Sequence, residues 1–166
     1  MGSHRGQIVD SRAFKTQGGT MNRRGIFTTA AEFDLSLDRY GKWRGVRGQS
    51  IHVMVFRTHT DLNLFIRCFC RSKKKYDGMF LWDHKKNDPN RTPILFEVNG
   101  LRLFGLVLLC RRTARRVGIV AHELFHATQH IGSGSPDESM ASLCESLSRQ
   151  YWRAWHRELA SDGKAV

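Results

Sequence analysis

The sequence predicts an α+β protein: a small, mainly antiparallel sheet with one preceding helix, followed by an antiparallel pair of long helices. Three observations predict this fold class. Short runs of alternating apolar or β-branched residues occupy the chain before about residue 110, as is typical of strands. Asn99-Gly100 separates two apolar-rich runs and tolerates the positive φ angles of a hairpin turn. After Thr113, apolar residues recur at helical spacing in two long segments joined by a short turn, which makes the two helices antiparallel neighbours.

The individual elements follow from local patterns along the chain. Thr60-Asp61 offers an N-cap for a first helix, and Ser135-Pro136 begins the last helix with an N-cap residue and a proline at the first position. Alternation predicts strands around 33–37, 51–56, 78–82, 94–98 and 101–104, the last extended by 106–110, and helical spacing predicts helices over about 60–70, 113–131 and 135–159.

Length and composition indicate one domain. A chain of 166 residues with 40% hydrophobic and 25% charged residues is large enough for a single core. Residues 1–25 carry no apolar period, so we expect a flexible lead-in, in part a cloning remnant, before a single domain over 26–166. No apolar run reaches the ~18–20 residues that cross a bilayer, and there is no secretory signal, which predicts a cytoplasmic protein without a membrane partner.

The chain is strongly basic, with 27 Lys and Arg residues against 15 Asp and Glu residues and a formal net charge of +12. Such a charge favours contact with nucleic acid or another acidic partner, although it also serves plain solubility. The four cysteines form no Cys-x-x-Cys pair, so neither a zinc knuckle nor a redox motif is indicated.

The main chemical signal is the segment Ala121-His122-Glu123-Leu124-Phe125-His126-Ala127 on the first long helix. Two histidines four residues apart share one helical face, close enough for both imidazoles to bind one metal ion. Glu123 stands beside them as a general base for a metal-activated water. Together with His130, these histidines form a stripe on the side away from Leu124 and Thr128, so they do not fill the core. The pattern therefore predicts a zinc hydrolase.

A catalytic zinc ion usually has three protein ligands, so one more is needed. His130 continues the histidine stripe, but three histidines on one straight helix surround a tetrahedral ion poorly, and we interpret it as substrate-facing, supporting or surface. On the next helix, Glu138 and Glu145 share one stripe, and only one of them can bind the metal. Glu138 also fits a capping box with Ser135, in which case Glu145 would be the ligand.

The motif segment, followed by Asp137-Glu138-Ser139-Met140-Ala141, resembles the gluzincin pattern of zinc metallopeptidases, His-Glu-x-x-His on one helix and Glu-x-x-Ala on the next. It is similar to compact zincins, including those encoded by tailed phages, over about residues 94–150. The resemblance implies a zincin-like catalytic domain in the (host) cytoplasm, with His122, His126 and Glu138 as Zn²⁺ ligands and Glu123 as general base. The metzincin pattern fails, because Gln129 and Gly132 stand where its glycine and third histidine should be.

The expected substrate is a protein or peptide. Zincins usually hold the substrate against an edge strand, and the strand from Leu101 to Leu109 is the candidate. Tyr151, His156 and Arg149 are weak candidates for an oxyanion stabiliser. Two alternatives remain: a protease that works at DNA, as SprT-like zincins do, and a basic nucleic-acid-binding protein with a structural or degenerate metal site.

Overall fold

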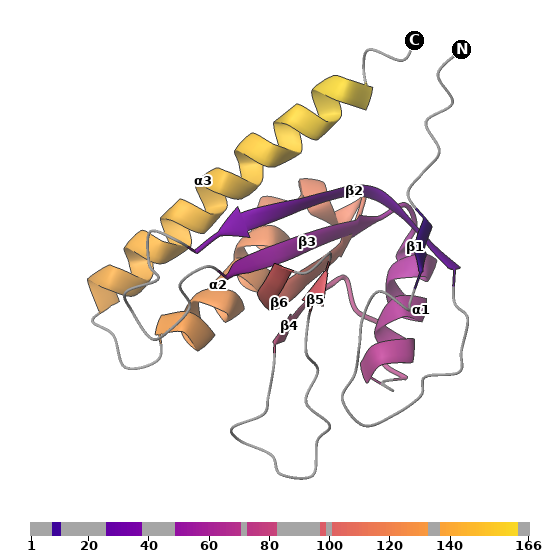
Figure 1. Ribbon diagram of the computed structural model, residues 1–166, viewed down its shortest axis with the longest axis horizontal. Coiled ribbons are helices and arrows are strands. Elements are labelled where there is room, and N and C mark those ends of the chain that lie inside the picture. The colour runs from indigo at the N-terminus through magenta and orange to yellow at the C-terminus, as the bar shows by residue number, and fades with distance from the viewer. Residues whose placement is uncertain are drawn as a thin grey trace.

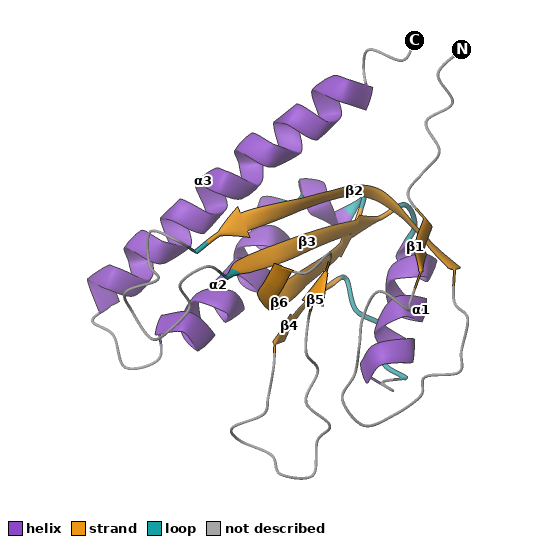
Figure 2. Ribbon diagram, viewed as in Figure 1, coloured by secondary structure: helices purple, strands orange, loops and turns teal. Residues whose placement is uncertain are grey.

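The computed structural model describes residues 8–10, 26–37, 49–70, 73–82, 97–98, 101–132 and 137–162, with side chains described within 29–37, 49–68, 73–82, 103–131 and 139–158. The chain is α+β, and helices lie on both sides of a sheet (Figures 1 and 2). The described elements are β1 (Ile8–Asp10), β2 (Ile26–Ser36), β3 (Ser50–Phe56), α1 (His59–Cys70), β4 (Gly78–Trp82), β5 (Glu97–Val98), β6 (Leu101–Cys110), the 3₁₀ turn η3 (Thr113–Arg115), α2 (Val117–Gly132) and α3 (Asp137–Asp162).

The sheet is mixed. Its strand order is β1-β2-β3-β6-β4, with β5 also paired to β6. Four of the pairings are antiparallel, as the local patterns predict, but β3 and β6 at the centre run parallel. Parallel neighbours need a long crossover connection, and the segment through α1, β4 and β5 provides it. The expectation of a mainly antiparallel sheet therefore missed the central pair.

Two hydrophobic cores lie on opposite faces of the sheet. On β3, Val53 and Val55 face α2 and α3, whereas Met54 and Phe56 face α1, as the two-residue period of a strand requires. Both β3 and β6 are covered on both faces, which explains why their sequences read as continuous apolar runs.

Helix α1 begins one residue earlier than its predicted cap. The Oγ1 of Thr58, not Thr60, accepts a hydrogen bond from the backbone N–H of Asp61 at 3.1 Å, and the Asp61 carboxylate accepts one from the Thr58 hydroxyl at 2.9 Å. The first bond caps the helix, and the second one orients the Thr58 hydroxyl that makes it. The helix otherwise has the predicted length, 12 residues.

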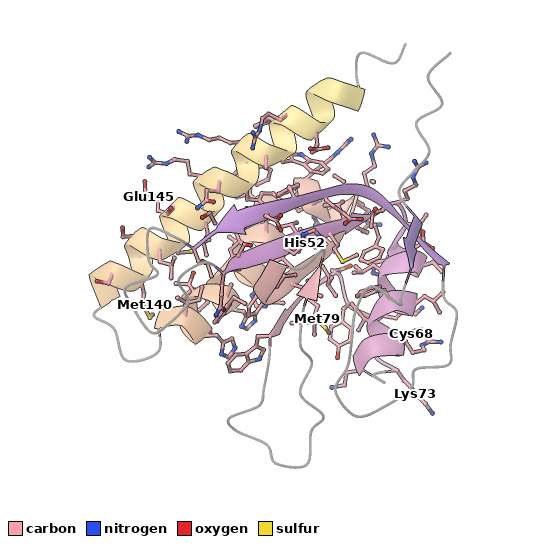
Figure 3. All side chains as sticks on the ribbon, viewed as in Figure 1. His52, Cys68, Lys73, Met79, Met140 and Glu145 are labelled. Carbon is pink, nitrogen blue, oxygen red and sulfur yellow. The ribbon has the colours of Figure 1, made fainter. Side chains whose placement is uncertain are left out.

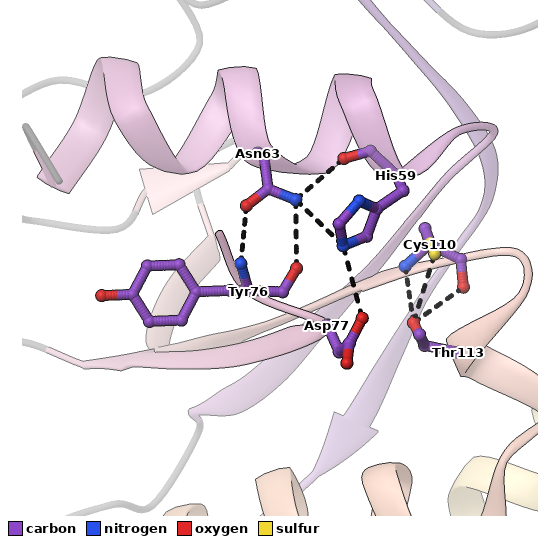
Figure 4. Close-up of polar contacts among 6 residues, drawn as sticks. All are labelled: His59, Asn63, Tyr76, Asp77, Cys110 and Thr113. Carbon is purple, nitrogen blue, oxygen red and sulfur yellow. Dashed lines mark hydrogen bonds and ion pairs between the residues drawn. The ribbon is translucent and has the colours of Figure 1, made fainter. Parts of the chain in front are cut away.

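Helix α2 begins at Val117, later than the predicted start at Thr113. Thr113 instead opens η3, where its Oγ1 accepts from the backbone N–H of Cys110 and donates to the Cys110 carbonyl, both at 3.1 Å. These local bonds compete with helix formation and produce a tight turn between β6 and α2. Figure 4 shows the turn. α3 is 26 residues long and packs against α2 in the core that contains Val53 and Val55.

Part of the predicted organisation falls on residues that the structure does not describe. The expected lead-in over 1–25 lies outside the described residues except for β1, a short strand that its sequence did not predict. Of the predicted hairpin, β5 pairs Val98 with Leu101, which leaves Asn99 and Gly100 between the paired residues. Among the described helices, none combines the length and the apolar character needed to span a bilayer.

A charged cluster of Glu32, Asp34 and His52 lies on neighbouring strands β2 and β3, on the sheet face that also carries Met54. His52 is 7% exposed. Its Nδ1 is 2.8 Å from Asp34 Oδ1 and its Nε2 is 3.2 Å from Glu32 Oε2. Burial opposes the charge on His52, but the hydrogen bonds and the charges of the two carboxylates outweigh it and raise the pKa of His52 to about 9. At neutral pH the imidazole is therefore a cation that donates to both carboxylates.

Candidate active site

The position of α2 is set by its apolar stripe. Val120, Leu124, Ala127 and Ile131 are buried at successive turns and pack against the sheet and α3. Thr128 is also buried, and its hydroxyl donates a hydrogen bond to the Leu124 carbonyl at 2.8 Å.

Helical spacing in the sequence predicts a core stripe on α2, and this prediction was partly wrong; its residues are Val117, Val120, Ala121, Leu124, Thr128 and Ile131. Val117, at 66% exposed, and Ala121 face outward, so the buried face is rotated towards Ala127 relative to the prediction. This rotation leaves the motif histidines beside the edge of the sheet.

His122 and His126 converge as predicted. Their Nε2 atoms lie 3.0 Å apart, and their rings meet edge to face at an interplanar angle of 88°. Two nitrogens bound at about 2.0–2.1 Å to one tetrahedral zinc ion are about 3.3 Å apart. The separation of the two nitrogens therefore fits two ligands of a single metal ion. His122 is exposed and His126 is half-buried, so the pair is open to solvent on one side.

Glu123 is 6% exposed and lies beneath the first residue of β4. A Cβ placed on Gly78 would approach Glu123 Cγ to 3.3 Å and Leu109 Cδ2 to 2.9 Å, so the strand reaches this close to the carboxylate only because residue 78 has no side chain. Burial raises the pKa of the Glu123 carboxyl above its usual range, and the charge of His122 and a backbone hydrogen bond from Phe80 partly oppose the rise.

A pocket of about 350 Å³ opens beside these residues. It lies between the N-terminal part of α2 and the beginning of β4, and one histidine of the motif and the buried carboxylate both line it. The lining residues are Asp77, Gly78, Gly118, Ile119, His122 and Glu123.

Hydrogen bonds to α1 fix the segment that enters β4 (Figure 4). The Asn63 side chain donates to the Tyr76 carbonyl at 3.0 Å and accepts from the Tyr76 N–H at 2.7 Å, replacing a strand partner for that residue. The next residue, Asp77, has its Oδ1 3.3 Å from the Nε2 of His59. These contacts hold Asp77 and Gly78 at the pocket, a role that no sequence pattern indicated for Asn63 or Asp77; only the glycine at the head of a strand hinted at a close approach.

His130 packs against β4 and does not join the histidine pair. Its ring stacks on Trp82 at a centroid distance of 3.1 Å and lies 6.0 Å from Phe80. The third histidine of the stripe therefore packs the far end of β4 against α2.

The predicted edge strand is wrong. The strand from Leu101 to Leu109 is part of β6, which pairs with β3 on one side and β4 on the other, so it lies inside the sheet. β4 is the last strand in the described order, and it lies directly over α2. Local alternation cannot reveal this, because strand order depends on contacts far apart in the sequence.

Of the two candidates for the third metal ligand, the structure describes the side chain of one only. Glu138 lies in the first turn of α3, but its side chain is outside the described residues, as is Ser135 of the predicted capping box. Glu145 is exposed and pairs with Arg149 one turn later. Figure 3 shows Glu145 on the outer side of α3, away from the sheet. Among the described side chains, no three His, Cys, Asp or Glu residues are grouped to hold a metal.

Two of the three oxyanion candidates on α3 have other roles. Tyr151 is fully buried and its hydroxyl donates to the Ala114 carbonyl at 2.9 Å, so it is not available to a substrate. Arg149 is committed to the exposed pair with Glu145. His156 is exposed, with its ring 6.4 Å from that of Trp152.

Chemically, the arrangement combines two convergent imidazoles, a buried carboxylate next to them and an adjacent pocket beneath a strand. Comparisons with protein-family models, curated proteins and solved structures found no match to this chain.

Proposed function

We propose that this protein is a zinc-dependent metallopeptidase with a zincin-like fold, in which α2 and α3 run antiparallel. The observation that carries the proposal is the 3.0 Å approach of the His122 and His126 Nε2 atoms beside the buried carboxylate of Glu123. His122 and His126 would hold zinc together with Glu138, the ligand implied by the gluzincin resemblance. Zinc bound there would supply a Lewis acid that polarises the scissile carbonyl and activates water.

Glu123 acts as the general base. Its carboxylate accepts a proton from the attacking water and passes it to the leaving amine as the peptide bond breaks. The Phe80 backbone and the close approach of Gly78 hold the carboxylate in place, so little reorganisation is needed when the proton moves.

β4 binds the substrate. An extended peptide adds to an edge strand through main-chain hydrogen bonds, and the pocket at the start of β4 receives one of its side chains. The stacking of His130 on Trp82 holds the far end of this strand against α2, and the bonds between Asn63 and Tyr76 hold its near end against α1.

Zinc content tests the metal site. We expect wild-type protein to bind one zinc ion, and His122→Ala and Glu138→Ala to lose it. His156→Ala is the matched control, because it removes an exposed histidine far from α2 in sequence and should keep the metal. Undiminished zinc in His122→Ala would refute the proposal. Zinc retained in Glu138→Ala but lost in Glu145→Ala would transfer the third ligand to Glu145.

Proteolysis tests the base. Glu123→Gln keeps the size of the side chain but cannot accept the proton, so this variant should retain zinc and lose cleavage of an unfolded protein substrate by about 10²-fold or more. Cleavage at the wild-type rate by zinc-loaded Glu123→Gln would contradict the mechanism while leaving the metal site intact.

A further inference from the structure

Five arginines gather at one edge of the sheet, and we refer to them as the arginine edge. Arg57 follows β3, Arg111 and Arg112 follow β6, and Arg115 and Arg116 lie immediately before α2. The parallel pairing of Phe56 with Cys110 places the ends of β3 and β6 side by side, and the Arg111 N–H donates to the Phe56 carbonyl at 2.8 Å. All five residues are exposed.

The local structure does not explain the charges of two of these residues. Arg115 and Arg116 precede the N-terminus of α2, which is the positive end of the helix dipole, where cations are unfavourable and carboxylates are preferred. The first turn of α2 contains no acidic residue. By contrast, Lys73 to Lys75 follow the C-terminus of α1, where the dipole favours positive charge.

Mutual repulsion adds to this cost. Adjacent strands lie about 4.8 Å apart, so Arg57 and Arg111 begin on neighbouring positions with the same charge. Within the part of the chain that the structure describes, no carboxylate forms an ion pair with Arg57, Arg112, Arg115 or Arg116. An arrangement that lowers the stability of the isolated protein gains its advantage when a polyanion neutralises it.

We propose that the arginine edge binds the phosphate backbone of a nucleic acid. Guanidinium groups match phosphate oxygens bidentately, and several exposed arginines on one edge suit a ligand with regularly repeated phosphates. Phosphate contacts carry no sequence information, so the binding is independent of sequence. The proposal does not depend on the metallopeptidase function.

Binding of a fluorescent duplex and of a single strand of the same length, each of about 20 nucleotides per strand, tests the proposal over about 50–200 mM salt. Replacing Arg112, Arg115 and Arg116 together by glutamine removes three charges from the arginine edge. We expect the affinity of the triple variant to fall at least about tenfold, and the slope of log K against log salt on the duplex to decrease by about 2.7, since each lost contact contributes about 0.9. The triple lysine variant keeps the charges and should retain most of the binding.

The matched control replaces three exposed arginines elsewhere by glutamine: Arg67 on α1, and Arg153 and Arg157 on α3. It has the same net charge as the glutamine variant, and we expect it to bind nearly as well as wild type. Thermal unfolding checks that the glutamine, lysine and control variants are all folded.

Three outcomes would overturn the proposal. The first is an equal loss of affinity in the triple glutamine variant and in the control variant, because binding would then depend on net charge and not on the arginine edge. The second is unchanged affinity of the arginine-edge variant for both nucleic acids. The third is competition by polyglutamate as effective as that by nucleic acid at equal charge concentration, which would identify an acidic protein as the partner.

Discussion

His52 should make the stability of this protein fall in mildly alkaline solution. Its pKa is higher in the folded protein, at about 9, than the value of 6.5 for an unperturbed histidine, so the folded state holds the proton more tightly than the unfolded chain. This stabilisation is complete below about pH 6.5 and is lost as the pH rises through about 9. The difference corresponds to about 3 kcal/mol of unfolding free energy.

Replacing His52 by glutamine isolates the effect. The variant cannot carry the charge, so its unfolding free energy should lack this part of the pH dependence, and wild type should lose about 3 kcal/mol more than the variant between about pH 6.5 and 9. The variant should also be less stable at neutral pH, because Glu32 and Asp34 then lie together without a cation.

Urea unfolding followed by tryptophan fluorescence measures the two curves at several pH values. His156→Gln is the matched control, since it removes an exposed histidine on α3. Parallel wild-type and His52→Gln curves across this pH range would refute the reasoning. On the acid side, burial opposes ionisation of Glu32, but hydrogen bonds with His52 and Thr29 lower its pKa, so its contribution is lost only as the pH falls through that lowered value.

Three further substitutions have defined expectations. Gly105→Ala would place a Cβ 2.6 Å from the Leu81 carbonyl oxygen and should destabilise the protein by about 1–3 kcal/mol, measured by urea unfolding; wild-type stability would contradict this packing. Gly118→Ala meets nothing within 4 Å and should instead stabilise it by up to about 1 kcal/mol, so a loss of stability would be the contrary result. Tyr151→Phe leaves the buried Ala114 carbonyl without its donor and should lower the melting temperature, corresponding to about 1–3 kcal/mol; an unchanged melting temperature would show that this hydrogen bond contributes nothing.

The convergence of the motif histidines follows from the sequence alone. Residues 122 and 126 must share a face once the segment is helical, because helix geometry fixes the relation between positions four apart. The strands β3 and β4 and the length of α1 were predicted for the same reason: period, caps and β-branched residues are local properties. The beginning of α2 was predicted incorrectly, because hydrogen bonds of the Thr113 side chain favour a turn over a helix there.

Strand order, the parallel central pair and the identity of the edge strand were decided only by the tertiary structure. Leu101 to Leu109 reads as a candidate edge strand in the sequence, yet β6 is covered on both sides because β3 and β4 pair with it across long sequence separations. The same long-range contacts bring Gly78 over Glu123, stack His130 on Trp82 and align the ends of β3 and β6, where the arginines meet. Local patterns report which face of an element is apolar, but which elements become neighbours depends on burying those faces together, so the sequence determined the motif and the fold determined its surroundings.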